Sequence, residues 1–311
     1  MPPSPTLSIQ LVTFGEPEAP DPATLLAWAR AAEEAGVDRL VVSDHVVFGE
    51  SLDDYGDPRR GGVSGGRQPT GPDGSWLEPL TVLAGIAAVT ERIRLQTGIL
   101  LAALRRPVVL AKTAATLDRL SGGRLDLGVG VGWQRAEYAA AGLDFRQRGR
   151  LLDHTLSVCR ALWTTSPAAV HDEFLDVEGL HAAPRPSGGI PVWISGRPHR
   201  RVVERIVRHG DGWIPWGEHM ADPRPGLAII AEALRAAGRD PAELAVQAAL
   251  TPVRDRDGRF DAAATFAPVP DLVAGGVTDV KAPVRLPADP AAARERLDAL
   301  VAAFREALDT A

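Results

Sequence analysis

An aspartate and a histidine stand side by side at positions 44 and 45, directly after the β-branched run Arg39–Ser43. A carboxylate beside an imidazole can exchange protons near neutral pH, so Asp44 and His45 are candidate acid and base groups. The alternative is that Asp44 caps a turn and His45 only packs. Their place at the end of a predicted strand favours catalysis, because parallel β/α folds carry their functional groups there.

A second candidate group follows the apolar run Ile190–Ser195. Its members are small, cationic or proline residues: Ser195, Gly196, Arg197, Pro198, His199 and Arg200. A helix pattern starts here, and free N–H groups at a helix start beside cationic side chains bind phosphate. Arg205 and Arg208 extend the positive charge along the helix, although they are equally compatible with a solvated helix surface. In an acidic chain, this local basic cluster favours a phosphate site.

Glycines occupy alternate positions, Gly128, Gly130 and Gly132, along and after the run Leu125–Val131. Missing side chains on one side of a strand admit a flat ring, or they relieve crowding inside a barrel. The spacing does not match a dinucleotide-binding fingerprint.

Several classes of function lack their usual residues. The seven histidines show no metal-binding spacing, and neither a nucleophile elbow nor a Walker loop is present. A net charge of −6 argues against nucleic acid or an anionic membrane as partner, and no apolar stretch is long enough to span a bilayer. A single cysteine, Cys159, and an N-terminus without a signal pattern predict a cytoplasmic protein that acts on a small molecule.

The elements that must position these residues alternate regularly between strand and helix, which predicts one (β/α)8 barrel domain over residues 1–311. The expected strands are Leu7–Thr13, Arg39–Ser43, Ile93–Gly98, Leu125–Val131, Ile190–Ser195, Gly212–Trp216, Leu244–Leu250 and Val277–Pro283. The expected helices are Pro22–Ala35, Glu78–Thr90, Pro107–Leu120, Arg148–Trp163, His199–His209, Arg224–Ala237 and Ala291–Leu308.

Two segments interrupt the alternation, after the second and the fourth predicted strands. Gly49–Ser75 is rich in Gly, Pro and Asp and is too long for an ordinary connection, so we expect a lid over the barrel mouth. Pro167–Pro191 has turn residues between Pro-rich ends and predicts a short hairpin before the fifth strand.

The chain resembles the luciferase-like monooxygenase superfamily, and in particular its branch that uses the deazaflavin coenzyme F420. The motifs that carry the resemblance are Ser43-Asp44-His45, Glu78-Pro79, Thr90-Glu91-Arg92-Ile93-Arg94-Leu95, Leu120-Ser121-Gly122-Gly123-Arg124, Leu127-Gly128-Val129-Gly130-Val131-Gly132-Trp133, Glu137-Tyr138, Pro191-Val192-Trp193-Ile194-Ser195-Gly196 and Gly210-Asp211-Gly212-Trp213. They run in the family's order along nearly the whole predicted barrel.

The resemblance implies a flavin or deazaflavin ring in the barrel mouth, beside a non-prolyl cis peptide bond between Gly98 and Ile99. The residues expected at the ring are Asp44, Gly98, Ile99, Val131 and Gly132. Those expected at the phosphate are Ser195, Gly196, Arg197, Pro198, His199 and Arg200. His45 is the expected proton donor, and the expected substrate pocket contains Phe14, Trp133 and Trp216. Sugar-phosphate dehydrogenases of the deazaflavin branch carry a glutamate where this chain has Trp133, which argues against that activity.

The implied function is F420-dependent hydride transfer to an activated C=C or C=O bond of a small organic substrate. The alternatives are an FMN-dependent luciferase-like monooxygenase and a noncatalytic flavin-binding relative. The resemblance also implies a homodimer, and a separate reductase that supplies reduced cofactor.

Overall fold

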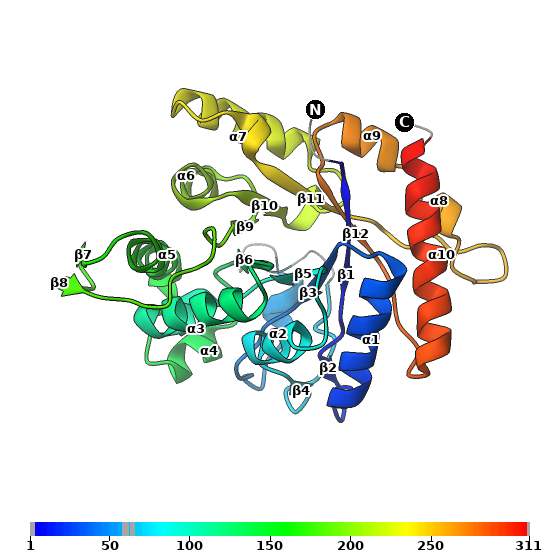
Figure 1. Cartoon of the computed structure of the whole chain (residues 1–311), viewed down its shortest axis with the longest axis horizontal. Coiled ribbons are helices and arrows are strands. Elements are labelled where there is room, and N and C mark those ends of the chain that lie inside the picture. The colour runs from blue at the N-terminus through cyan, green and yellow to red at the C-terminus, as the bar shows by residue number, and fades with distance from the viewer. Residues whose placement is uncertain (1–3, 58–61, 63–65, 310–311) are drawn as a thin grey trace.

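A closed barrel of eight parallel strands forms the centre of the computed structural model, which describes residues 4–57, 62 and 66–309 (Figure 1). In order around the barrel, the strands are β1 (Thr6–Gln10), β3 (Arg39–Val42), β5 (Arg94–Thr97), β6 (Leu125–Val129), β9 (Val192–Gly196), β10 (Gly212–Pro215), β11 (Ala245–Ala249) and β12 (Asp279–Ala282). All eight predicted strands are confirmed. Most are shorter than expected, because several flanking apolar residues lie in loops at the barrel mouth.

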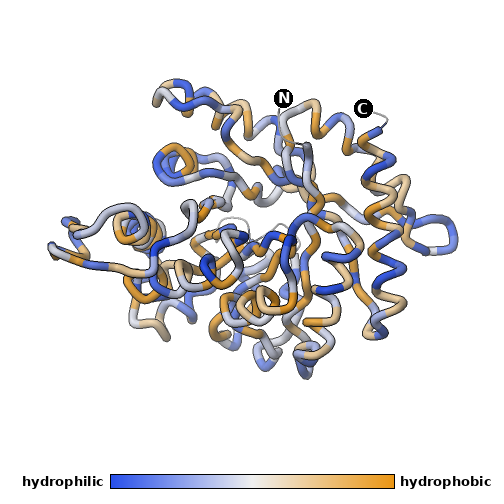
Figure 2. Tube along the Cα trace, viewed as in Figure 1, coloured by the Kyte–Doolittle hydropathy of each residue, from blue (hydrophilic) through white to orange (hydrophobic). Residues whose placement is uncertain are grey.

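Helices surround the barrel (Figure 1), and hydrophobic and hydrophilic residues alternate along them, as the colouring in Figure 2 shows. The seven predicted helices correspond to α1 (Pro22–Ala35), α2 (Pro79–Ala87), α3 (Pro107–Leu120), α5 (Arg148–Thr164), α6 (Arg200–His209), α7 (Arg224–Ala236) and α10 (Pro290–Asp309). Local sequence sets their ends: the Asp21 carboxylate accepts the N–H groups of Ala23 and Thr24 at the start of α1. Among the described residues, no helix has the length and apolar character needed to cross a membrane.

Several short elements were not expected from the sequence. They are the helices α4 (Arg135–Ala140), α8 (Ala262–Phe266) and α9 (Val269–Ala274), the strands β2 (Phe14–Gly15) and β4 (Ser75–Trp76), and the 3₁₀ turns η1 (Asp53–Gly56), η3 (Ala102–Leu104), η4 (Phe145–Gln147), η5 (Gly217–His219) and η6 (Pro241–Glu243). Elements of one or two turns carry too little periodicity to stand out in a sequence. Two of these additions, α4 and the antiparallel β2–β4 ribbon, contribute to the candidate site described below.

The predicted hairpin is confirmed as the antiparallel pair β7 (Ala168–His171) and β8 (Asp176–Leu180). It lies in the connection between α5 and β9, at the edge of the molecule in Figure 1. Because β9 begins after it, the hairpin belongs to the end of the barrel where the strands start, away from the barrel mouth.

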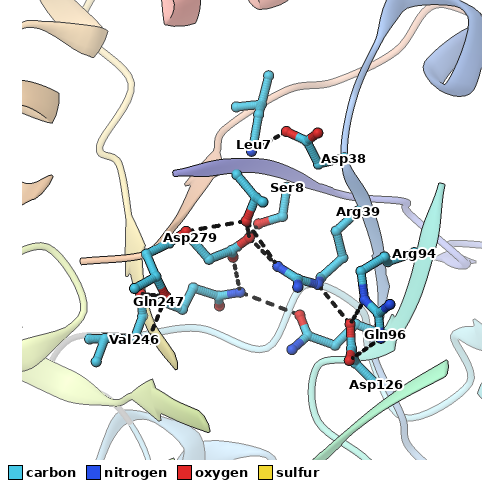
Figure 3. A network of polar contacts seen from close by, with 12 residues as sticks. Leu7, Ser8, Asp38, Arg39, Arg94, Gln96, Asp126, Val246, Gln247 and Asp279 are labelled. Carbon is cyan, nitrogen blue, oxygen red and sulfur yellow. Dashed lines mark hydrogen bonds and ion pairs between the residues drawn. The ribbon is translucent and has the colours of Figure 1, made fainter. Parts of the chain in front are cut away.

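A buried polar network fills the opposite end of the barrel interior from the mouth (Figure 3). Arg39 Nε donates to Asp126 Oδ2 at 3.0 Å, and its Nη1 forms an ion pair with Asp279. Arg94 holds both oxygens of Asp126 at 2.7 Å, and Gln247 Nε2 donates to Asp279 Oδ2 at 2.8 Å. These charges are paired and hydrogen-bonded, as buried charges must be. The network closes this end of the barrel and leaves the other end for ligands.

Candidate active site

His45 and Glu137 form a hydrogen-bonded pair at the barrel mouth. His45 follows β3, Glu137 lies in α4, and His45 Nδ1 is 3.2 Å from Glu137 Oε1. The same oxygen accepts the backbone N–H of Val46 at 2.8 Å, which fixes the carboxylate. The Glu137 side chain is 1% exposed and that of His45 is 10% exposed. A carboxylate at Nδ1 favours the tautomer with its proton on that nitrogen and leaves Nε2 to face a substrate.

The His45 ring is enclosed by aromatic side chains. Its centroid lies 4.6 Å from Phe48, 4.7 Å from Trp76 and 5.9 Å from Trp133. The β2–β4 ribbon stacks Phe14 on Trp76, with the ring centroids 4.1 Å apart. Two residues predicted for the substrate pocket, Phe14 and Trp133, therefore lie near His45, although Trp133 is itself buried.

Asp44 is buried and both of its carboxylate oxygens have partners. Arg105 Nη1 donates to Oδ2 at 2.6 Å and Nη2 donates to Oδ1 at 3.1 Å, while the Leu101 N–H donates to Oδ2 at 2.8 Å. These contacts fix the loop that follows β5, only two residues beyond Ile99. The geometry gives Asp44 a positioning role, and the proposed contact with a cofactor ring stays a prediction.

The Gly98–Ile99 peptide bond is cis. Gly98 and Ile99 line a small cavity of about 40 Å³ together with Ser195 and Trp216, so residues expected at the ring and at the phosphate share one space. Val131 and Gly132 lie farther along the same mouth. The Val131 carbonyl accepts the Tyr138 hydroxyl at 2.7 Å, and Gly132 has a φ of 67°.

The alternating glycines serve close packing of the chain itself. A Cβ on Gly128 would lie 2.0 Å from the Thr97 carbonyl oxygen, and one on Gly130 would lie 2.7 Å from the Ile99 side chain. Of the two interpretations of the pattern, relief of crowding therefore applies to Gly128 and Gly130.

The predicted phosphate site has the expected backbone geometry. His199 precedes α6 without forming a side-chain cap, and Arg200 is exposed, with Nη1 3.2 Å from Glu204. Gly196 has a φ of 149°, and a Cβ there would meet Val202 at 2.9 Å. Partial burial, and then the nearby arginines, lower the pKa of His199. The first turn of α6 thus presents N–H groups beside positive charge.

The structure corrects the prediction that Arg205 extends the positive charge of this site along the helix. Arg205 is buried, and it pairs with Asp153 of α5 at 2.6 Å and donates to the Gly149 carbonyl at 3.0 Å. It belongs to the α5–α6 packing and not to an exposed basic face, whereas Arg208 is exposed.

The described part of segment 49–75 lies against the site. Tyr55 packs edge-on against Trp133 with centroids 5.4 Å apart, and Trp216 Nε1 donates to the Gly62 carbonyl at 3.3 Å. The Gly49 N–H donates to Gln134 Oε1 at 2.8 Å. These contacts agree with a covering segment; the part of the expected lid at residues 58–61 and 63–65 lies outside the described residues.

A large pocket of about 1160 Å³ opens beside the small cavity, at the ends of β1, β11 and β12. Phe14 lines it, whereas Trp216 lines the small cavity, so the three predicted substrate residues do not share one wall. Lys281 and Ala249 line both spaces. Glu137 and Lys281 were not predicted as site residues; the rarity of lysine in this chain was the available signal for Lys281.

Several of the buried polar atoms without a hydrogen-bond partner lie in α4 and in the loops that follow the strands. Within the described residues they include Thr13 Oγ1, Ser43 Oγ, Trp133 Nε1, Gln134 Nε2 and Glu137 Oε2. Buried polar groups are normally satisfied, so such a collection is suited to a polar ligand. The described residues contain no group of three His, Cys, Asp or Glu that could hold a metal ion. An organic cofactor with hydrogen-bonding ring edges fits these donors and acceptors.

Comparisons with known proteins agree with this architecture. The chain is 35% identical over 185 residues to the uncharacterized protein Rv0953c of Mycobacterium tuberculosis, and the match covers 59% of this chain and 65%, just under two thirds, of that protein. It shares its fold with the monooxygenase RslO1 from Streptomyces bottropensis at a TM-score of 0.73 and 20% identity, over 94% of this chain and 97% of that one. It also shares its fold with the coenzyme F420-dependent tetrahydromethanopterin reductase from Methanopyrus kandleri. That comparison has a TM-score of 0.71 and 16% identity, and it covers 97% of this chain and 100% of that one.

The family model for luciferase-like monooxygenases matches residues 7–308. That range contains all the site residues named above and all eight barrel strands, of which only the first residue of β1, Thr6, lies outside it. The chain therefore belongs to the luciferase-like monooxygenase family.

Proposed function

We propose that this protein is an F420-dependent oxidoreductase that transfers a hydride between the deazaflavin and an activated C=O or C=C bond of a small organic substrate. The observation that carries the proposal is the His45–Glu137 pair at 3.2 Å. A hydride delivered to a carbonyl or an activated alkene requires a proton from a second group, and an oriented histidine at a barrel mouth suits that role.

The deazaflavin supplies the hydride chemistry when it is bound. In its protonated form His45 donates the Nε2 proton to the substrate and becomes the neutral Nδ1–H tautomer, and in the reverse direction Nε2 of that tautomer takes the proton back. Glu137 holds the imidazole in the required tautomer and stabilises it when it is positively charged. Asp44 and Arg105 hold the loop that carries the Gly98–Ile99 peptide, and the first turn of α6 binds the cofactor phosphate together with Arg197 and Arg200. A separate reductase or dehydrogenase would replenish the reduced cofactor.

An FMN-dependent monooxygenase is the second candidate, favoured by the fold that the chain shares with RslO1. That reaction would consume oxygen and would require reduced flavin. Because both cofactors carry a phosphate, the α6 site accommodates either of them.

The test is a fluorescence titration of the purified chain with oxidised F420 and, in parallel, with FMN. We expect micromolar or tighter binding of F420, weakened about tenfold or more when His199 and Arg200 are both replaced by alanine. Arg208→Ala is the matched control, since Arg208 is an exposed arginine at the far end of the same helix. Preferential binding of FMN would support the monooxygenase, and binding of neither cofactor would refute both candidates.

A further inference from the structure

Lysine is rare in this chain: of its 34 basic residues only two, Lys112 and Lys281, are lysines. Lys112 lies on the outer helix α3, where its ammonium binds the Ala183 carbonyl. Lys281 lies in β12, two residues beyond Asp279 of the buried polar network, so both side chains point into the barrel. An isolated cation inside a barrel is costly, and therefore it is expected to have a function.

The Lys281 ammonium has no hydrogen-bond or ion-pair partner among the described residues. Its nearest influential charge is Asp279, which already binds Arg39, Gln247 and Ser8. Burial, only partly offset by Asp279, lowers the pKa of Lys281. A bound anion would therefore stabilise the charged form of this amine.

The position of Lys281 connects the two spaces of the site. On one side it lines the small cavity with Gly98 and Ser195, where the cofactor ring is proposed to bind. On the other side it lines the large pocket with Phe14. Among the described residues, Lys281 and Ala249 line both spaces, so a substrate that extends from the large pocket toward the ring would lie beside the Lys281 amine.

The wall of the large pocket is also cationic. Arg254, Arg259, Arg285 and Arg296 line it, and Glu295 is the one carboxylate among its described lining residues. Arg254 and Arg259 lie on the hydrophilic loop between β11 and α8, seen in blue in Figure 2. In a chain with a net charge of −6, this local positive field would attract anions.

We propose that the large pocket is the substrate pocket and that Lys281 binds a carboxylate of the substrate at its inner end. This inference rests on the proposed function for the identity of the reaction, but not for the binding. One compact ammonium matches one carboxylate, whereas the arginines farther out attract the anion without enclosing it. Lys281 would thus determine specificity by favouring carboxylate-bearing substrates over their neutral amides.

The scarcity of lysine makes this testable in the protein as it exists. Reductive methylation with ¹³C-formaldehyde labels Lys112, Lys281 and the N-terminal amine, and Lys112→Arg and Lys281→Arg assign their NMR signals. The labelled protein is then titrated with benzoate and, as a neutral match, with benzamide. We expect benzoate to shift the Lys281 signal saturably and to leave the Lys112 signal unchanged, while benzamide has a much smaller effect.

Variants and cofactor binding complete the experiment. Lys281→Met should weaken benzoate binding about 10- to 100-fold, since a hydrogen bond to a charged group is lost, whereas Lys112→Met should not. Equal shifts with benzoate and benzamide, or none at Lys281 in the unsubstituted protein, would overturn the inference even if Lys281→Met fails to fold. Carboxylate binding at Lys281 without F420 or FMN binding would refute the proposed function alone, and cofactor binding without a carboxylate effect would refute this inference alone.

Discussion

The imidazole of His45 lies 3.2 Å from the carboxylate of Glu137, which a backbone N–H also holds in place. The two residues are 92 positions apart: His45 lies in the loop after β3, and Glu137 lies in α4. The pairing gives His45 a defined orientation as well as a charged partner.

We predict that Glu137→Gln lowers kcat/KM of the proposed reaction about 10- to 100-fold, and His45→Gln about 10²- to 10⁴-fold. The glutamine keeps an acceptor for the Val46 N–H but loses the charge that stabilises the imidazolium. The ¹⁵N shifts of His45 should show mainly the Nδ1–H tautomer in the unsubstituted protein and a mixture in Glu137→Gln. Glu173→Gln, at an exposed ion pair with Arg150, is the control. An unchanged tautomer with full activity would remove Glu137 from the mechanism.

Breaking the buried ion pair between Asp44 and Arg105 should be costly. Arg105→Met leaves a fully buried carboxylate with only the Leu101 N–H, and we expect the free energy of unfolding to fall by about 3 kcal/mol. Adding Asp44→Asn should recover part of this loss, which a double-mutant cycle by urea unfolding would measure. Arg146→Met, at a pair whose arginine is 85% exposed, should change stability by less than about 0.5 kcal/mol. Equal losses of stability in Arg105→Met and Arg146→Met would contradict the conclusion that the Asp44–Arg105 pair is buried and stabilising.

His209 should make the protein less stable in acid. Its ring is buried without a hydrogen-bond partner among the described residues, and burial, opposed by Asp153, lowers its pKa to about 4. Between about pH 6.5 and pH 4 the unfolded chain therefore binds more protons at this site than the folded one, so stability falls as the pH falls through that window.

Urea unfolding between pH 7 and pH 4 measures this effect. The unsubstituted protein should lose about 2 kcal/mol more than His209→Leu over this range. His171→Leu, at an exposed histidine whose pKa is raised by its hydrogen bond to Asp176, should retain the acid-side loss of the unsubstituted protein. If the free energy of unfolding depended on pH in the same way in the unsubstituted protein and in His209→Leu, the predicted role of His209 would be wrong.

Gly128→Ala should destabilise the barrel by about 3 kcal/mol or prevent folding, because the added Cβ would overlap the Thr97 carbonyl oxygen. Gly188→Ala is the matched change, since a Cβ there meets no atom within 4 Å. Thermal unfolding of both variants checks the contrast. A near-neutral Gly128→Ala would mean that the β5 and β6 backbones can separate at this point.

The barrel could be read from the sequence because its signals are local. Most strands are short apolar runs bounded by Gly, Pro or Asp, and the long helices carry an apolar period, with a local stop such as Gly36 at the end of α1. The start of α6 could be predicted in the same way, since Ser195 to Arg200 are consecutive and the helix begins among them, and the phosphate site there stays a prediction. The position of His45 at the mouth follows from its strand.

The partners of these residues were decided by the tertiary structure. The sequence predicts Asp44 as an acid or base, and closure of the barrel gives it Arg105, 61 residues away, as a partner. Glu137 reaches His45 only because α4, too short to show a helix period, folds back over the mouth. The burial of Lys281 and its place between the two pockets follow from the residues that surround it inside the closed barrel. Local sequence sets the elements because their propensities act over a few residues, whereas charge pairing and burial depend on which distant residues closure brings together.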